Sequence, residues 1–129
     1  MIAYVVAPHP SDAELTALWL VAWGNAGPAT FQGILSRSLT HVGAYAADNL
    51  VGFVNVAWDG GVHAFILDTC VAPQFRRQGI ATRLVKLAAE TAAKRGAVWL
   101  HVDFEPQLLH FYRGCGFRKT EAGLMRLRP

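Results

Sequence analysis

The segment VAPQFRRQGIATRL, residues 71–84, joins the end of a predicted strand to the start of a predicted helix. The first turn of a helix carries unpaired N–H groups and a partial positive charge, so this junction can hold an anion such as a phosphate. Gly79 lets the backbone approach a ligand closely, and the small Ala81 keeps the first helical turn open. Three arginines add charge: Arg76, Arg77 and Arg83. The segment predicts an anion site, although an ordinary arginine-rich helix start has the same composition.

A second group of residues could move protons. In the apolar stretch Ala97 to Phe104, strand alternation places His101 and Asp103 on the same side. Histidine has a reference pKa of about 6.5, so His101 is a candidate base with Asp103 orienting its ring. Asp68 and Glu105 are rival bases. A structural histidine and a train of ordered water with no single base are the other interpretations.

The remaining nucleophiles and metal ligands give weaker signals. Cys115 lies five residues after His110, which offers a covalent alternative, but its place in a glycine-flanked turn favours simple packing. Cys70 and Cys115 lack CxxC spacing, so we expect neither a disulfide framework nor a zinc cluster. The other histidines are scattered without metal-ligand spacing, and we expect no metal.

The elements that must position these residues follow from the hydrophobic periodicity. We expect a strand over residues 2–7, a helix that begins at the capping box Ser11/Glu14 and stops at Gly24, and a short helix near residues 31–37 within a loop. Three antiparallel strands follow, over 41–46, 50–58 and 62–71. A helix from Gly79 to Gly96, a strand over 97–104, a helix over 106–113 and a last strand near 123–127 complete the order.

Composition bounds the class of protein. The 129 residues are 53% hydrophobic and 16% charged, which fits one globular domain spanning residues 1–129 rather than a disordered chain. No run approaches the length of a membrane helix and no signal peptide is apparent, so we expect a cytoplasmic protein that binds no membrane. Up to residue 75 there are one basic and five acidic residues; from Arg76 onward there are eleven and four. The second half is therefore suited to an anionic ligand.

The run RRQGIA, Arg76 to Ala81, matches the R/Q-x-x-G-x-G/A signature of the GNAT superfamily of N-acetyltransferases. Downstream, FYRGCGF, residues 111–117, resembles the Y-x-x-x-G-F element of the same superfamily. The spacing of the two motifs and the strands around them also fit, so the resemblance covers nearly the whole chain. One departure is Glu105, where many members carry Asn before the last helix.

The resemblance implies an α/β (α+β) fold with a central mixed, mostly antiparallel twisted sheet, splayed open around acetyl-CoA and flanked by helices. The pyrophosphate would lie on the amides of Arg77 to Thr82, the pantothenate arm beside Cys70, and an amide near Val71 would hold the thioester oxygen. Tyr112, in the second motif, would be the general acid for the departing thiolate. The cofactor-binding residues implied are Cys70, Val71, Ala72, Arg76, Arg77, Gln78, Gly79, Ile80, Ala81 and Thr82.

The implied activity is acetyl transfer from acetyl-CoA to a primary amine by direct attack. The acceptor is a small molecule or a peptide; an acidic, aromatic-rich first half favours a cationic amine with an apolar part. A homodimer is compatible with the sequence. The alternatives are a GNAT-like domain that binds acyl-CoA without catalysis, and a nucleic-acid-binding module. The second lacks interleaved basic and aromatic residues, so we expect no nucleic acid as partner.

Overall fold

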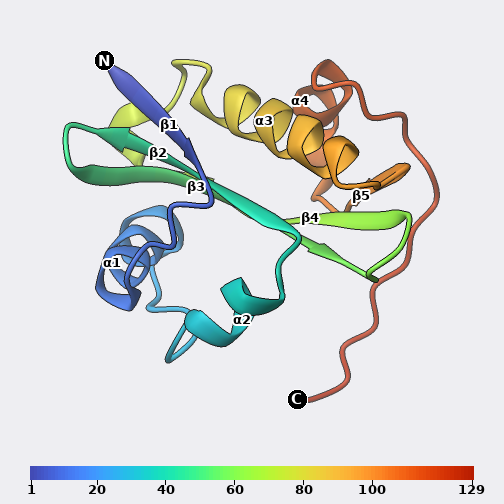
Figure 1. Cartoon of the computed structure of the whole chain (residues 1–129), viewed down its shortest axis with the longest axis horizontal. Helices are drawn as coiled ribbons and strands as arrows, with labels where there is room; N and C mark the ends of the chain where they lie inside the picture. Colours follow the sequence, from blue (N-terminus) through green and yellow to red (C-terminus); the bar gives the residue numbers. More distant parts are fainter.

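The computed structural model describes all residues, 1–129, as a five-stranded sheet with helices on both faces (Figure 1). The elements in chain order are β1 (Ile2–Val6), α1 (Asp12–Trp23), α2 (Gln32–Arg37), β2 (Thr40–Ala46), β3 (Asn49–Trp58), β4 (His63–Val71), the 3-10 turn η1 (Pro73–Phe75), α3 (Ile80–Lys94), β5 (Trp99–Val102), the 3-10 turn η2 (Pro106–Leu108) and α4 (Leu109–Gly114). No helix has the length and apolar character required to cross a bilayer.

The strands lie in the order β1-β2-β3-β4-β5. The first four pair antiparallel: β1 is joined to β2 by the segment that carries α1 and α2, and short turns join β2 to β3 and β3 to β4. β5 joins β4 in parallel after the long α3 crossover. The predicted fold class, a mixed and mostly antiparallel sheet flanked by helices, is therefore confirmed.

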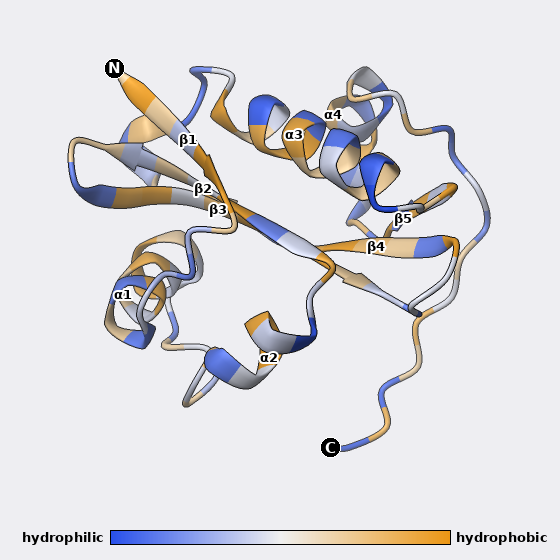
Figure 2. Cartoon of the chain, viewed as in Figure 1, coloured by the Kyte–Doolittle hydropathy of each residue, from blue (hydrophilic) through white to orange (hydrophobic).

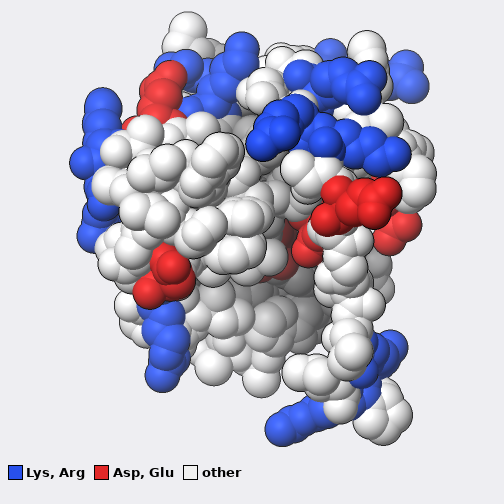
Figure 3. Space-filling view, turned by 90° about the vertical axis from the view of Figure 1, so that its right-hand side faces the viewer, with Lys and Arg blue, Asp and Glu red and all other residues white.

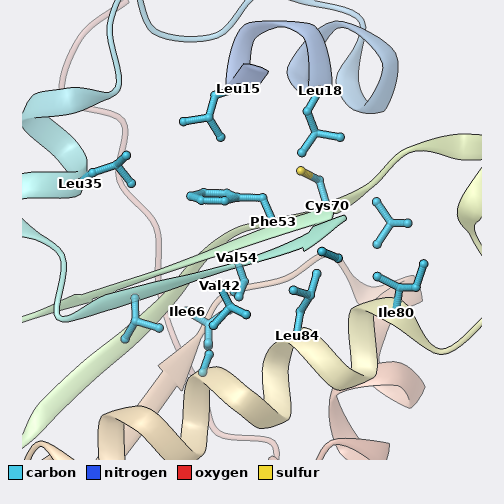
Figure 4. Close-up of a cluster of buried hydrophobic side chains, with 14 of the residues drawn as sticks. Leu15, Leu18, Leu35, Val42, Phe53, Val54, Ile66, Cys70, Ile80 and Leu84 are labelled. Carbon is cyan, nitrogen blue, oxygen red and sulfur yellow. The ribbon is translucent and has the colours of Figure 1, made fainter. Parts of the chain in front are cut away.

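Helices α1 and α2 cover one face of the sheet, and α3 and α4 cover the other (Figure 1). Figure 4 shows Leu15, Leu18 and Phe53 packed on the first face, and Val54 and Leu84 on the second. Because both faces are covered, β3 carries a nearly continuous apolar run, and orange segments recur along the strands in Figure 2. Fully burying one such side chain stabilises the fold by about 1.5–3 kcal/mol.

The first helix begins and ends as the sequence predicts. Ser11 Oγ accepts from the Glu14 N–H at 3.1 Å, and Glu14 Oε1 accepts from the Ser11 N–H at 3.0 Å, which completes the capping box. Gly24 ends the helix with a φ of 77°. The following loop is tied back to α1, because Asp12 Oδ1 accepts from the Phe31 N–H at 2.8 Å.

The sheet separates between β4 and β5. Their pairing runs only from His63↔Trp99 to Ile66↔Val102. Just beyond it, Asp68 has a φ of 58° and the register of β4 against β3 shifts, which is a β-bulge. The second half of β4 therefore has an edge that no strand covers, as the resemblance implied.

The expected last strand, residues 123–127, does not form. Residues 117–129 carry no regular structure, and the side chains of Leu124 and Leu127 are 91% and 88% exposed. β5 is also shorter than the predicted 97–104. The apolar residues of this segment are compatible with a strand, but a strand gains stability only from a partner edge, and residues 123–127 have none.

Candidate functional site

A cavity of about 410 Å³ opens where β4 and β5 separate. Helix α3 begins at one end of it, and α4 forms the opposite wall. Its lining joins the two motif segments that lie some thirty residues apart in sequence: Trp23, Thr69, Cys70, Val71, Phe75, Arg76, Arg77, Gly79, Ile80, Ala81, Thr82, Leu108, Phe111 and Tyr112. We call this space the wedge cavity.

Backbone amides line one end of the wedge cavity. None of the N–H groups from Arg77 to Thr82 donates to an acceptor in the chain, and the first bond of α3 is that of Arg83 N–H to Gly79 O at 3.1 Å. Arg77 and Gly79 have φ values of 64° and 79°, so the backbone turns sharply before the helix starts. Nothing lies within 4 Å of where a Gly79 Cβ would stand. These unpaired amides at a helix N-terminus fit a pyrophosphate.

Arg76 braces this loop instead of reaching freely into the cavity. Its Nε donates to Val71 O at 3.0 Å, and its Nη2 donates to Ala22 O at 3.3 Å, at the end of α1. The guanidinium still contributes its charge to the cavity wall. Arg77 makes no side-chain hydrogen bond, so its charge is available to a ligand.

The open edge of β4 offers one further donor. Ala72 N–H donates to Val51 O at 2.8 Å, toward β3. Alternate residues of a strand direct their backbone groups to opposite edges, so the Val71 amide faces the edge that β5 leaves uncovered. Of the residues that the sequence predicts to bind the cofactor, Ala72 already has its amide bonded, and neither Ala72 nor Gln78 is in the cavity lining.

Tyr112 lies in the opposite wall with only 6% of its surface exposed. Phe104 stacks on its ring with centroids 4.8 Å apart, and Phe111 and Phe117 meet it edge-on. Burial raises the pKa of Tyr112 and the hydroxyl of Thr69 partly offsets the rise, so the phenol is protonated at neutral pH.

His101 and Asp103 line a different cavity, of about 850 Å³, around β5. His101 Nε2 lies 2.9 Å from His63 Nδ1, and its ring stacks on Phe65 at a centroid distance of 4.5 Å. Asp103 forms no hydrogen bond with His101, so the expected orienting contact is absent and His63 takes its place. The structure does not bring the predicted base and the predicted acid into one cavity.

Sequence reasoning missed His63 and Phe65. They neighbour Trp99 and His101 only through the register of two strands that lie far apart in the chain. We call these four side chains the imidazole shelf. It is open to solvent, with 39% of Phe65 and 53% of Trp99 exposed.

The rival groups lie outside the wedge cavity. Asp68 stands on the bulge, where burial raises the pKa of its carboxyl, and Glu105 precedes η2. Cys115 lines the shelf-side cavity, and burial raises the pKa of its thiol, which disfavours the thiolate needed for covalent catalysis.

Charge is unevenly spread over the face that carries α4 and the C-terminal segment. Figure 3 shows Lys and Arg side chains gathered along one edge, with acidic side chains next to them and a hollow below. The basic side chains on this face do not form an uninterrupted surface such as a nucleic-acid backbone would require.

Comparison with known proteins gives one family. The model of the acetyltransferase (GNAT) family matches residues 10–117. Streptothricin acetyltransferase of Streptomyces lavendulae is 33% identical over 112 residues, 84% of this chain and 59% of that protein. The tRNA(Met) cytidine acetyltransferase of Yersinia pestis is 28% identical over 121 residues, 91% of this chain and 17% of that protein. The chain thus spans less than two thirds of the length of these relatives.

Solved structures agree on the fold. A GNAT acetyltransferase from Streptococcus pneumoniae superposes with a TM-score of 0.80 at 24% identity, covering 99% of this chain and 100% of that one. An aminoglycoside N-acetyltransferase in complex with CoA gives 0.78 at 19% identity, covering 99% and 95%. With the motifs on the wedge cavity and the family match over most of its length, the chain belongs to the GNAT family of acetyltransferases.

Proposed function

We propose that this protein transfers the acetyl group of acetyl-CoA directly to a primary amine, with the CoA held in the wedge cavity. One observation carries the proposal: the cavity that holds a buried neutral tyrosine, Tyr112, is also lined by Arg77 and by Gly79 to Thr82, whose amides are unpaired. Acetyl-CoA supplies an activated thioester. The amides would hold its pyrophosphate, and the open edge of β4 at Cys70 and Val71 would bind its pantothenate arm.

Two groups act on the reacting atoms in this proposal. The Val71 amide would donate to the thioester oxygen as negative charge develops there. The Tyr112 hydroxyl would give its proton to the departing thiolate, a role suited to a phenol that is neutral at physiological pH.

Removing the proton of the amine is assigned to the imidazole shelf through water. When His101 donates from Nε2 to His63 Nδ1, its own Nδ1 carries a lone pair and can accept a proton. Asp103, in the same cavity, would add negative charge that attracts a cationic amine.

The acceptor surface is proposed to be the imidazole shelf and the neighbouring Leu67. Its aromatic rings and imidazoles suit a cationic amine with an apolar part. The names of two GNAT proteins similar to this chain, streptothricin acetyltransferase and aminoglycoside N-acetyltransferase, make these antibiotic amines the first compounds to test.

The test is release of CoA from acetyl-CoA in the presence of a panel of amines, with Tyr112→Phe as the variant. We expect kcat to fall by about 10–100-fold while the acetyl-CoA Kd, measured by calorimetry, stays within about twofold. Tyr45→Phe, a half-exposed tyrosine outside both cavities, is the matched control. Unchanged turnover in Tyr112→Phe would remove the acid assignment. Acetyl-CoA binding with no turnover of any amine would favour the non-catalytic acyl-CoA-binding alternative.

A further inference from the structure

The Thr69 hydroxyl is the one buried side-chain oxygen or nitrogen in the structure that has no hydrogen-bond partner. Buried hydroxyls are nearly always paired, because leaving one unpaired is costly. Thr69 lies in the lining of the wedge cavity. The hydroxyl makes no hydrogen bond of regular geometry within the chain, so it is free to turn toward a partner in the cavity.

The β-bulge in β4 determines where Thr69 points. Leu67 pairs with Asn55 and Cys70 pairs with Phe53, so Asp68 and Thr69 together stand opposite a single residue of β3. A bulge of this kind reorients the side chains that follow it. Cys70 faces the core beside Leu18 in Figure 4, and Thr69 lines the cavity.

Tyr112 lines the same cavity as Thr69. Burial raises the pKa of Tyr112, the Thr69 hydroxyl lowers it, and the nearby Cys115 raises it. The other groups packed on the Tyr112 ring are the aromatic side chains of Phe104, Phe111 and Phe117, none of which can hydrogen-bond the phenol oxygen.

We propose that Thr69 is a positioning residue: its hydroxyl donates a hydrogen bond to the Tyr112 oxygen and thereby directs the phenol proton into the cavity, toward the sulfur of the departing thiol. This inference rests on the proposed function. In the reaction, the C–N bond forms, the C–S bond breaks and the Tyr112 proton moves to sulfur. The proton on Thr69 stays in place, and the proton released by the amine returns to the tyrosine through solvent.

The kinetic test compares Thr69→Val, which keeps the shape but not the donor, with Thr69→Ser, which keeps the donor. We expect Thr69→Val to lower kcat about tenfold with an unchanged acetyl-CoA Kd, and Thr69→Ser to stay near the unchanged protein. In a Tyr112→Phe background, Thr69→Val should cost nothing further, since its effect passes through the phenol oxygen. An equal loss in both backgrounds indicates a merely structural role and overturns the proposal.

A second readout needs no acceptor. The chain has three tyrosines, so spectra of protein labelled with ¹³C at tyrosine Cζ can be assigned with the Tyr112→Phe variant. Thr69→Val should raise the pKa of Tyr112 and Thr69→Ser should not; an unchanged pKa in Thr69→Val overturns the proposal. If Tyr112→Phe leaves turnover unchanged, the acid role in the proposed function fails, and the spectra still decide whether Thr69 bonds the phenol.

Discussion

The wedge cavity and the imidazole shelf are built from different kinds of chemical group. Backbone amides at the start of α3, the open edge of β4 and one buried tyrosine form the first. Exposed side chains from β4 and β5, held by strand register, form the second. The first can bind the invariant, anionic part of a ligand; the second can vary its side chains without disturbing the backbone.

This difference explains why the wedge cavity can be predicted from the sequence and the imidazole shelf cannot. A site made of amides is encoded by the residues that shape a short loop, so it leaves a contiguous motif. A site made of side chains on paired strands leaves no local pattern, because register brings together residues that lie almost forty positions apart, such as His63 and His101.

The sharpest test of the wedge cavity is Gly79→Asp. The left-handed φ of 79° is strained for any side chain, and a carboxylate among the amides would repel a pyrophosphate. We expect the acetyl-CoA Kd to rise at least about 100-fold, or about 2.8 kcal/mol, in calorimetry. Gly96→Asp is the matched control: its φ is 102°, its surroundings are also open, and it lies at the far end of α3. Equal loss in both variants would mean that backbone strain, and not the amide cradle, is responsible.

A buried histidine outside both regions shows what burial alone does to the pKa of an imidazole. His41 is buried at 2% exposure, and its Nε2 accepts from the His9 N–H at 3.0 Å. Burial lowers the pKa of His41 to about 4, below the unfolded value of about 6.5. Between these values the unfolded chain binds more protons, so stability is full above pH 6.5 and falls as the pH drops toward 4.

The loss at the acid end is at most about 3.5 kcal/mol, at about 1.4 kcal/mol for each unit of pKa difference. Urea unfolding at pH 7, 5.5 and 4.5 measures it. His41→Gln, which retains an acceptor for the His9 amide, should flatten the dependence, whereas the exposed His110→Gln should not. A dependence that survives His41→Gln would have to come from other groups.

A comparison of Arg76 with Arg77 separates the effect of positive charge on cofactor binding from the effect of hydrogen bonds on stability. Arg76→Met loses two hydrogen bonds to backbone carbonyls, so we expect a lower Tm and an acetyl-CoA Kd about tenfold higher. Arg77→Met removes the same charge from a side chain that makes no hydrogen bond, so its Kd should rise with an unchanged Tm. If both variants lower Tm equally, the bonds of Arg76 do not brace the loop.

The smallest effect is expected on the shelf. His101→Gln should leave the acetyl-CoA Kd unchanged and raise the acceptor KM by about three- to tenfold. If His101 also accepts the amine proton, kcat falls as well. His110→Gln serves as the control. No change in either kinetic constant would show that the shelf is not the acceptor surface.

Much of the fold was predictable because its signals are local. The capping box at Ser11 and Glu14 forms as the spacing indicates, and Gly24 ends α1 in the expected left-handed conformation. The strand predicted at residues 123–127 was wrong for the opposite reason. A strand also needs the edge of a neighbouring strand to pair with, and no local pattern shows whether that edge is within reach.

The candidate site was predictable in part. The wedge residues Cys70, Val71, Gly79 and Tyr112 lie together, as their two motifs indicate. The pairing of His101 with Asp103 was wrong. Alternation correctly put both at one cavity but could not reveal that His63, on the neighbouring strand, would reach the ring first.

The sequence by itself determined the helices, the antiparallel strands and the amide loop before α3, because each depends on residues within a few positions of one another. Only the tertiary structure decided which hydroxyl lines the cavity with Tyr112, which imidazole meets His101 and which strand edge stays open. These depend on the bulge at Asp68 and on the register between β4 and β5, where a shift of one residue would turn every side chain to the opposite face.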